Sequence, residues 1–278
     1  MTEILTRFRL GKYAVTTDIE KAFLQIGLDE SDRDAIRFFW LSNPSDATSP
    51  LTTYRFKSVL FGATCSPFIL NATLLKHFEE NPSKTSSRIA QDLYVDNVLT
   101  SFDDESSALQ FYRESRSLLQ KGGFNLRSWN SNSAKLRELA YRENTLDLNG
   151  TVKILGMRWN VDEDKLLFPE VQVNLNMKDV TKREILRQSS KIFDPLGLLN
   201  PVTVKAKILM QSLWKQNFGW DECLPFDIKD QWNNLAEELA DATSLEFHRY
   251  LYKSETSNNL KSLHIFTDAS KQAYGACA

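Results

Sequence analysis

Two short stretches decide the fold: YAVTTDI at residues 13–19 and QDLYVDNVLTS at 91–101. Both are rich in β-branched and aromatic residues, which predicts β-strands. The first stretch predicts one strand, and the second predicts two short strands around a tight turn at Asp96-Asn97. Each stretch carries an aspartate beside apolar residues, Asp18 in the first and Asp96 in the second.

A carboxylate at the end of a buried strand costs free energy unless it binds a cation or hydrogen-bond donors. Taken singly, Asp18 can be a helix N-cap and Asp96 a hairpin-turn residue, which are common roles for aspartate. Brought together on adjacent strands, they can hold two Mg²⁺ ions about 3.5–4 Å apart. Such a pair lowers the pKa of an attacking 3′-hydroxyl and neutralises a triphosphate and its leaving group.

The segment between the two aspartates predicts a strand at 53–59, then FGATCSP at 61–67, then a helix that ends near Glu80. Ser66-Pro67 suits an N-cap followed by proline at the first helical position. Gly62 allows the backbone to approach a ligand closely, and the helix N-terminus favours anions. The alternative is a plain turn with a helix cap.

The rest of the chain alternates between predicted strands, helices and loops without an internal repeat. A turn or short helix is expected at 20–27 and a polar turn at 29–34. The remaining predictions are strands at 35–41, 124–129 and 151–160, a hairpin turn and strand at 161–168, a strand pair in the last 16 residues, helices at 103–123, 181–217 (broken near 194–197) and 228–241, and loops at 42–52 and 81–87.

Composition indicates an ordinary globular protein of 278 residues, enough for roughly two domains of ~150 residues. The net charge of −2 disfavours a wholly basic surface but allows a local basic groove. The three cysteines have no disulfide or zinc spacing, which favours a reducing compartment. No signal peptide and no apolar run near ~18 residues is present, so we expect no membrane partner and a cytoplasmic location.

Five motifs, in order, resemble those of reverse transcriptases. They are TTDIEKAF at 16–23 (motif A), LFGATCSPF at 60–68 (motif B), YVDN at 94–97 (motif C), GGFNLRSWNSN at 122–132 (motif D) and VKILGMRW at 152–159 (motif E, the primer grip). The run from Ser189 to Pro225 resembles the thumb and connection of Pao/BEL retroelements. LHIFTDASKQAYGACA at 263–278 resembles the first strand pair of a retroelement RNase H.

The resemblance implies an α+β fold: a right-hand polymerase palm, built as an antiparallel sheet with helices on one face. A mostly helical thumb and connection, and the first strands of an RNase H-like domain, would follow. The expected divisions are 1–160, 161–262 and 263–278. The implied activity is RNA-directed DNA polymerization by a Pao/BEL-type element, on an RNA or DNA template with a primer and deoxynucleoside triphosphates, within the cytoplasm or retroelement particles.

The resemblance also assigns roles to residues. Asp18, Asp96 and Asn97 would be catalytic, and Asp18, Asp96 and the carbonyl of Ile19 would bind Mg²⁺ or Mn²⁺. The nucleotide would contact Phe23, as the steric gate against a 2′-hydroxyl, together with Phe61 and Gly62. The primer would contact Tyr94, Val95, Leu155, Gly156 and Met157. Phe23 has a competing interpretation as a core residue, since aromatic side chains are usually buried.

The sequence departs from the family pattern at several points. Asn97 stands where a second aspartate is usual, and it keeps an oxygen ligand without the charge. Arg127 and Ser128 occupy the stretch where motif D usually has a lysine. We expect the front of the fingers to be missing and Asp268 to form only an incomplete RNase H site, so no RNase H activity is predicted.

Two other interpretations compete with a polymerase. A catalytically inactive relic, or a co-opted nucleic-acid-binding protein, would also fit the departures. A calcium module at 29–34 or 103–105 fits poorly, because neither stretch has the acid spacing and central glycine of a calcium loop. Residues 178–207 hold seven Lys and Arg against three acids, which suits either phosphate contacts or a solvated helix face.

Overall fold

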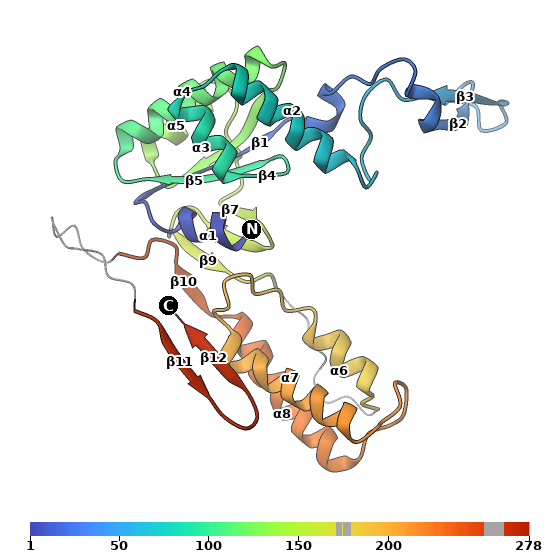
Figure 1. The fold of residues 1–278 in the computed structure, drawn as a ribbon, viewed down its shortest axis with the longest axis vertical. Helices are drawn as coiled ribbons and strands as arrows, with labels where there is room; N and C mark the ends of the chain where they lie inside the picture. The colour runs from blue at the N-terminus through green and yellow to red at the C-terminus, as the bar shows by residue number, and fades with distance from the viewer. Residues whose placement is uncertain (171–173, 175–178, 253–263, 278) are drawn as a thin grey trace. The chain divides into compact units, whose positions relative to one another are not determined.

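A computed structural model describes residues 1–170, 174, 179–252 and 264–277. The chain forms two compact units, coloured along the sequence in Figure 1. The first unit is Gly11–Leu148, and the second combines Met1–Leu10 with Asn149–Ala278. The divisions expected at residues 160 and 262 stay predictions, and the second of them lies outside the described residues.

The first unit is built on a four-stranded antiparallel sheet with the order β4-β5-β1-β6. Its strands are β1 (Tyr13–Ile19), β4 (Leu93–Tyr94), β5 (Asn97–Phe102) and β6 (Leu126–Ser131). β1 therefore has the bounds predicted from YAVTTDI. It is hydrogen-bonded on both sides, so its residues are held more firmly than those of an edge strand.

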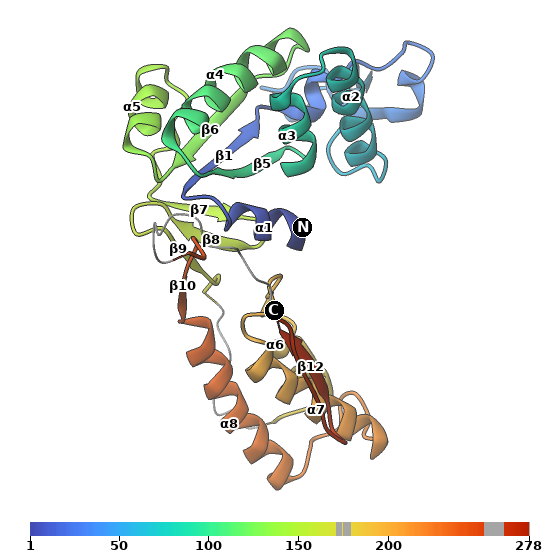
Figure 2. The same ribbon diagram turned by 60° about the vertical axis from the view of Figure 1, so that its left-hand side comes forward.

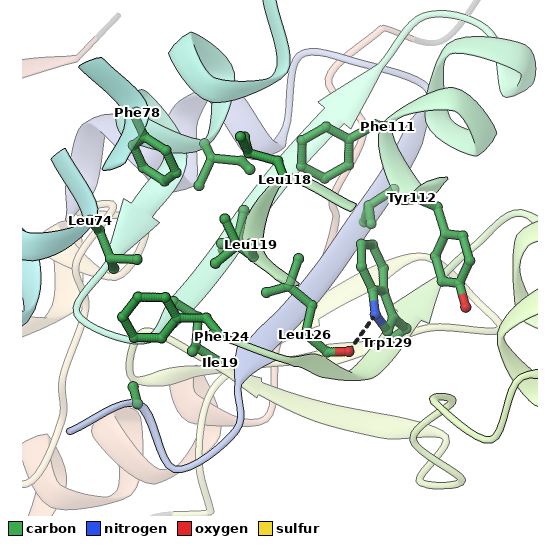
Figure 3. Close-up of a cluster of buried hydrophobic side chains, with 14 of the residues drawn as sticks. Ile19, Leu74, Phe78, Phe111, Tyr112, Leu118, Leu119, Phe124, Leu126 and Trp129 are labelled. Carbon is green, nitrogen blue, oxygen red and sulfur yellow. Dashed lines mark hydrogen bonds between the residues drawn. The ribbon is translucent and has the colours of Figure 1, made fainter. Parts of the chain in front are cut away.

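Four helices belong to the same unit: α2 (Ser66–Glu80), α3 (Lys84–Asp92), α4 (Glu105–Lys121) and α5 (Ala134–Arg142). Figure 2 shows α3 and α4 lying on one side of β1 and β5. The core between helices and sheet contains residues from all four helices and from β1, β5 and β6. Figure 3 shows part of it, including Leu74, Leu119 and Trp129, whose indole N–H donates to the Leu126 carbonyl at 3.3 Å. The predicted palm of antiparallel strands with helices on one face is confirmed.

The local predictions around residues 81–92 of this unit were wrong. Residues 81–87 were expected to be a loop and Gln91 to start a strand, but α3 covers residues 84–92. Its start is fixed by a capping box. The Ser83 hydroxyl accepts a hydrogen bond from the Ser86 amide, and the Ser86 hydroxyl accepts one from the Ser83 amide. The motif has Ser instead of Glu at the third helical position, which hid it in the sequence.

A separate antiparallel hairpin pairs β2 (Arg37–Leu41) with β3 (Leu51–Arg55). The strand predicted at 35–41 is confirmed apart from its first two residues, which belong to the short 3₁₀ helix Arg33–Ile36. The second strand begins and ends earlier than the predicted 53–59. Ser66 was expected to cap α2, but it is the first helical residue and its hydroxyl donates to the Leu60 carbonyl at 2.6 Å.

The second unit contains an antiparallel sheet with the order β10-β9-β8-β7. The strands of this sheet are β7 (Thr151–Ile154), β8 (Met157–Asn160), β9 (Lys165–Leu167) and β10 (Glu246–His248), and the helix α1 (Thr2–Phe8) belongs to the same unit. The fully buried Arg249 donates to Asp164 Oδ1 and to the Phe8 carbonyl, both at 2.6 Å. One buried cation thus joins the N-terminal helix to a sheet formed by distant sequence.

The same unit holds α6 (Lys182–Ser189), α7 (Asn200–Lys215) and α8 (Phe226–Thr243), which share a core that includes Leu213 and Trp232. The break predicted near 194–197 separates α6 from α7. The predicted terminal strand pair is β11 (Phe266–Ala269) with β12 (Tyr274–Cys277). Within the described part of the chain, every helix is too short or too polar to span a lipid bilayer.

Neighbouring leucines on α2 test the packing of the first unit. Leu74 is fully buried in the core, whereas Leu75 is 39% exposed. We predict that Leu74→Ala lowers the free energy of unfolding by about 2–5 kcal/mol, because it leaves a cavity. Leu75→Ala is the matched control and should change it by less than about 1 kcal/mol. Urea denaturation measures both, and equal losses would contradict the packing described.

Candidate active site

The first unit brings the two predicted aspartates to neighbouring strands. Asp18 is the penultimate residue of β1 and pairs in register with Asn97, the first residue of β5. One residue further along, the Ile19 amide donates to the Asp96 carbonyl at 2.8 Å. The resemblance had implied this meeting of motifs A and C, and hydrogen-bonded strand ends produce it.

Asp18 lies in surroundings that disfavour its charge. Burial raises the pKa of its carboxyl, and the neighbouring Asp96 adds to the rise, whereas a hydrogen bond from Ser128 and the charge of Arg127 oppose it. Its Oδ1 atom is buried and has no hydrogen-bond partner. An ionised oxygen left without a partner is costly in a protein interior, so this atom has unused capacity for a ligand.

Asp96 lies in the turn between β4 and β5. This turn begins one residue earlier than predicted. The turn residues are Val95 and Asp96, and Val95 takes a left-handed conformation with φ of 59°. Such a conformation is uncommon for a β-branched residue and marks a constrained position. Asn97 is in the strand, and its amide Nδ2 donates to Asp96 Oδ1 at 2.7 Å. The residue that replaces the usual second aspartate therefore orients the first one.

Arg127, which the sequence showed only as a departure from the usual motif D, lies beside Asp18. Arg127 pairs with Asp18 across β1 and β6, and its guanidinium forms an ion pair with Glu20. Asn125 also donates to Glu20, at 2.9 Å. The GGFNLRSWNSN stretch thus supplies a positive charge next to the carboxylates. Its position opposite Asp18 depends on a register shift in the β1–β6 pairing, which the sequence pattern does not reveal.

Phe23 and Phe61 come together although they are far apart in sequence. Phe23 belongs to the short 3₁₀ helix Ala22–Gln25 and is 8% exposed, whereas Phe61 is 57% exposed. Their rings meet edge to face, with centroids 5.0 Å apart. Gly62 follows with φ of 86°, a conformation that favours glycine. Phe23 is both a core residue and the inner wall of an exposed aromatic surface, so the two interpretations are compatible.

The residues expected to contact the primer lie at two hairpin turns. Tyr94 is 37% exposed at the end of β4, next to Val95. In the second unit, Leu155 and Gly156 form the β7–β8 turn with φ of 45° and 89°. Two consecutive positive φ values are typical of a type I′ turn, in which the second residue is commonly glycine.

The residues present fit a divalent cation. Carboxylate and backbone carbonyl oxygens are the ligands that Mg²⁺ takes in proteins; Asp18 has an orphaned Oδ1 atom, and the charge of Asp96 is near enough to raise the pKa of Asp18. Among the described residues, no three His, Cys, Asp or Glu side chains gather closely enough to bind a metal ion. A site built from Asp18, Asp96 and the carbonyl of Ile19 has only two such side chains.

The basic run at 178–207 is largely neutralised by partners of its own. Lys182 is buried, with its ammonium 3.3 Å from the centroid of the Trp214 ring. The other paired cations are Arg183 with Asp221, Arg187 with Glu184 and Lys205 with Glu238. Lys178 lies outside the described residues. These pairs favour the interpretation of a solvated helix face over a row of phosphate contacts.

Asp268, expected as the first acid of an RNase H site, lies on β11. It is exposed, and its Oδ1 accepts from the Ala269 amide at 2.8 Å. Among the described residues, Asp268 belongs to no group of three or more His, Cys, Asp or Glu side chains that could hold a metal ion. The predicted incompleteness of this site stays a prediction.

An antiparallel sheet with helices on one face, one aspartate near the end of β1 and a second aspartate in the turn before the neighbouring β5 has the architecture of a nucleic-acid polymerase palm. The family model described as reverse transcriptase (RNA-dependent DNA polymerase) matches residues 2–156. The chain belongs to the reverse transcriptase family. A second model, described as the Pao retrotransposon-like RNaseH-like domain, matches residues 181–278. Both agree with the resemblance found in the motifs.

A solved structure of similar fold is that of the foamy viral protease-reverse transcriptase in complex with RNA/DNA hybrid. It is 15% identical, has a TM-score of 0.52 and matches 86% of this chain. The chain spans 28% of that protein's length. A search of curated proteins gave no match.

The electrostatics of Asp18 predict a pH-dependent stability. Because the folded-state pKa of Asp18 is raised, the contribution of Asp18 to wild-type stability is greatest below the ordinary carboxyl pKa of about 4 and is lost as pH rises through the folded-state pKa. Without divalent cations, we therefore expect Asp18→Asn to be more stable than wild type at pH 7, with the difference vanishing near pH 3. Urea denaturation in EDTA measures this.

The exposed Asp103, next to α4, provides the control. Asp103→Asn should not reproduce the pH-dependent gain. A wild-type chain at least as stable as Asp18→Asn at pH 7 would contradict the assigned surroundings of Asp18.

Proposed function

We propose that this chain performs template-directed DNA synthesis, in which deoxynucleotides from triphosphates are joined to the 3′-end of a primer paired with RNA or DNA. One observation carries the proposal. In a reverse transcriptase palm, the Asp18 carboxylate lies near the end of β1 and the Asp96 carboxylate lies in the turn that leads into the neighbouring β5, and Asp18 has a buried oxygen without a partner. An arrangement that costs stability in the free protein is typical of a functional site.

Asp18, Asp96 and the carbonyl of Ile19 would hold Mg²⁺ or Mn²⁺ in this proposal. When bound, divalent cations promote ionisation of the 3′-hydroxyl and neutralise charge on the triphosphate. The Asn97 amide fixes one Asp96 oxygen through its hydrogen bond and leaves the other available. The site thus has two charged ligands, and Asn97 reduces its total negative charge relative to a motif with two consecutive aspartates.

The exposed Phe61 and the buried Phe23 beneath it would form the nucleotide site. Phe61 presents more than half of its surface, and Phe23 supports it from below through the edge-to-face contact. A rigid ring at Phe23 would exclude a sugar 2′-hydroxyl by steric contact. Gly62 has no side chain to add bulk to the surface that follows Phe61, and its positive φ favours glycine at this position.

The primer strand would contact Tyr94 and Val95 at one turn and Leu155 and Gly156 at the other, while Met157, which is 1% exposed, would support the second turn from beneath. Both turns hold residues at positive φ, so their backbone shapes are tightly defined. The RNA/DNA hybrid in the foamy viral structure supports a hybrid as the nucleic-acid partner. Residues 1–160 would then act as palm with residual fingers, and 161–262 as thumb and connection.

Primer extension with Mg²⁺ or Mn²⁺ tests the proposal. We predict that the wild-type chain extends a DNA primer on an RNA template and that Asp96→Ala reduces kcat at least about 100-fold, because a metal ligand is lost. Asn97→Asp should raise extension, because it adds a negative charge beside the cations.

Asp103→Ala removes an exposed carboxylate near the same hairpin and should extend like wild type. Extension that survives in Asp96→Ala would show that synthesis does not depend on this hairpin. If no folded variant extends the primer, the chain shares only its ancestry with active reverse transcriptases, and the interpretation as an inactive relic is supported.

A further inference from the structure

The β7–β8 turn is constrained from outside its own hairpin. Gly156 has φ of 89°, which already disfavours other residues. A Cβ atom placed on Gly156 would also lie 2.4 Å from Cδ1 and Cε1 of Phe193. The Phe193 ring therefore rests directly on the backbone of the turn, in contact that no other residue type at position 156 would permit.

The segment that carries Phe193 is fixed by its own hydrogen bonds. The carboxylate of Asp194 accepts from the Leu198 amide at 3.0 Å and from the Leu199 amide at 2.6 Å. Leu199 is buried and is the N-cap residue of α7. The Thr2 hydroxyl donates to the Pro195 carbonyl at 3.0 Å. The residues that directly follow Phe193 are thus hydrogen-bonded to the start of α7 and to α1.

Simple burial does not account for this contact. Phe193 remains 46% exposed, so the hydrophobic gain is only part of what a core phenylalanine contributes. The sheet beneath the turn is already well packed, since Ile154 and Met157 on either side of it are each 1% exposed. The ring instead covers the exposed side of a two-residue turn, where it limits movement of Leu155 and Gly156.

We propose that Phe193 is a positioning residue for the primer-contacting turn. Its ring holds Leu155 and Gly156 in a fixed position relative to the start of α7, and this position determines where the primer end lies. This inference rests on the proposed function, because it assumes that the turn contacts the primer. Its physical part, the immobilisation of the turn by the ring, is independent of activity.

Two measurements on Phe193→Ala test the inference. Hydrogen exchange should become faster in the peptide 151–160, because the turn loses its cover. In primer extension, the KM for primer–template should rise at least about fivefold, while kcat and the KM for deoxynucleotide stay near wild type. Phe193→Tyr keeps the ring and should restore both. Phe226→Ala, which removes an 80% exposed ring in the same unit, is the matched control.

The outcomes separate this inference from the proposed function. Unchanged exchange in Phe193→Ala would overturn the positioning role whether or not the chain extends primers. An unchanged KM for primer–template in an active chain would overturn it as well, as would equal effects of Phe193→Ala and Phe226→Ala. If the wild type extends nothing, the proposed function fails, and the role of Phe193 in primer placement fails with it. Faster exchange would then support only a structural contact.

Discussion

The hydrogen bond from the Ile19 amide to the Asp96 carbonyl joins the end of β1 to the turn that precedes β5, so the two residues that carry carboxylates, Asp18 and Asp96, lie on neighbouring segments. It can form only because β1 lies between β5 and β6 in the middle of the sheet. The helical layer secures β1 by covering Val15 and Ile19 on one face of the strand. Asp18, which directly precedes Ile19, belongs to the other face because side chains alternate along a strand. Core packing and placement of the carboxylate are therefore consequences of one strand register.

The charges around this register oppose one another. Burial and Asp96 raise the pKa of Asp18, whereas Ser128 and Arg127 lower it. Arg127 is itself paired with Glu20, so its charge is shared between two carboxylates. The free protein consequently holds an acidic site whose charge is only partly compensated, and a cation would complete the compensation. Asn97 moderates the excess because it donates to Asp96 where the family usually has another acid.

Much of this arrangement was predictable from the sequence. β1 and the end of α2 follow from local pattern, whereas α2 begins at Ser66, the residue expected to cap it, and the order of the five motifs indicated the palm. The α3 start was missed because Ser86, a weak cue, closes its capping box. The place of Arg127 was missed because it depends on a shift in strand pairing between Thr16 and Asp18. The contact of Phe193 with Gly156 joins segments distant in sequence, so no local pattern contains it. The general rule is that strand registers and long-range contacts are set by the packed whole, whereas single elements are set by nearby residues.

We propose that Asp18 and Asp96 bind the same divalent cations. The most direct measurement is oxidative cleavage of the folded chain by Fe²⁺ substituted for Mg²⁺, with the cut sites mapped by mass spectrometry. A shared site predicts cuts near both residue 18 and residue 96, both suppressed by excess Mg²⁺. It also predicts that Asp96→Asn removes the cut near residue 18 as well as its own. A cut near residue 18 that persists in Asp96→Asn, or cleavage at neither position, would contradict the account.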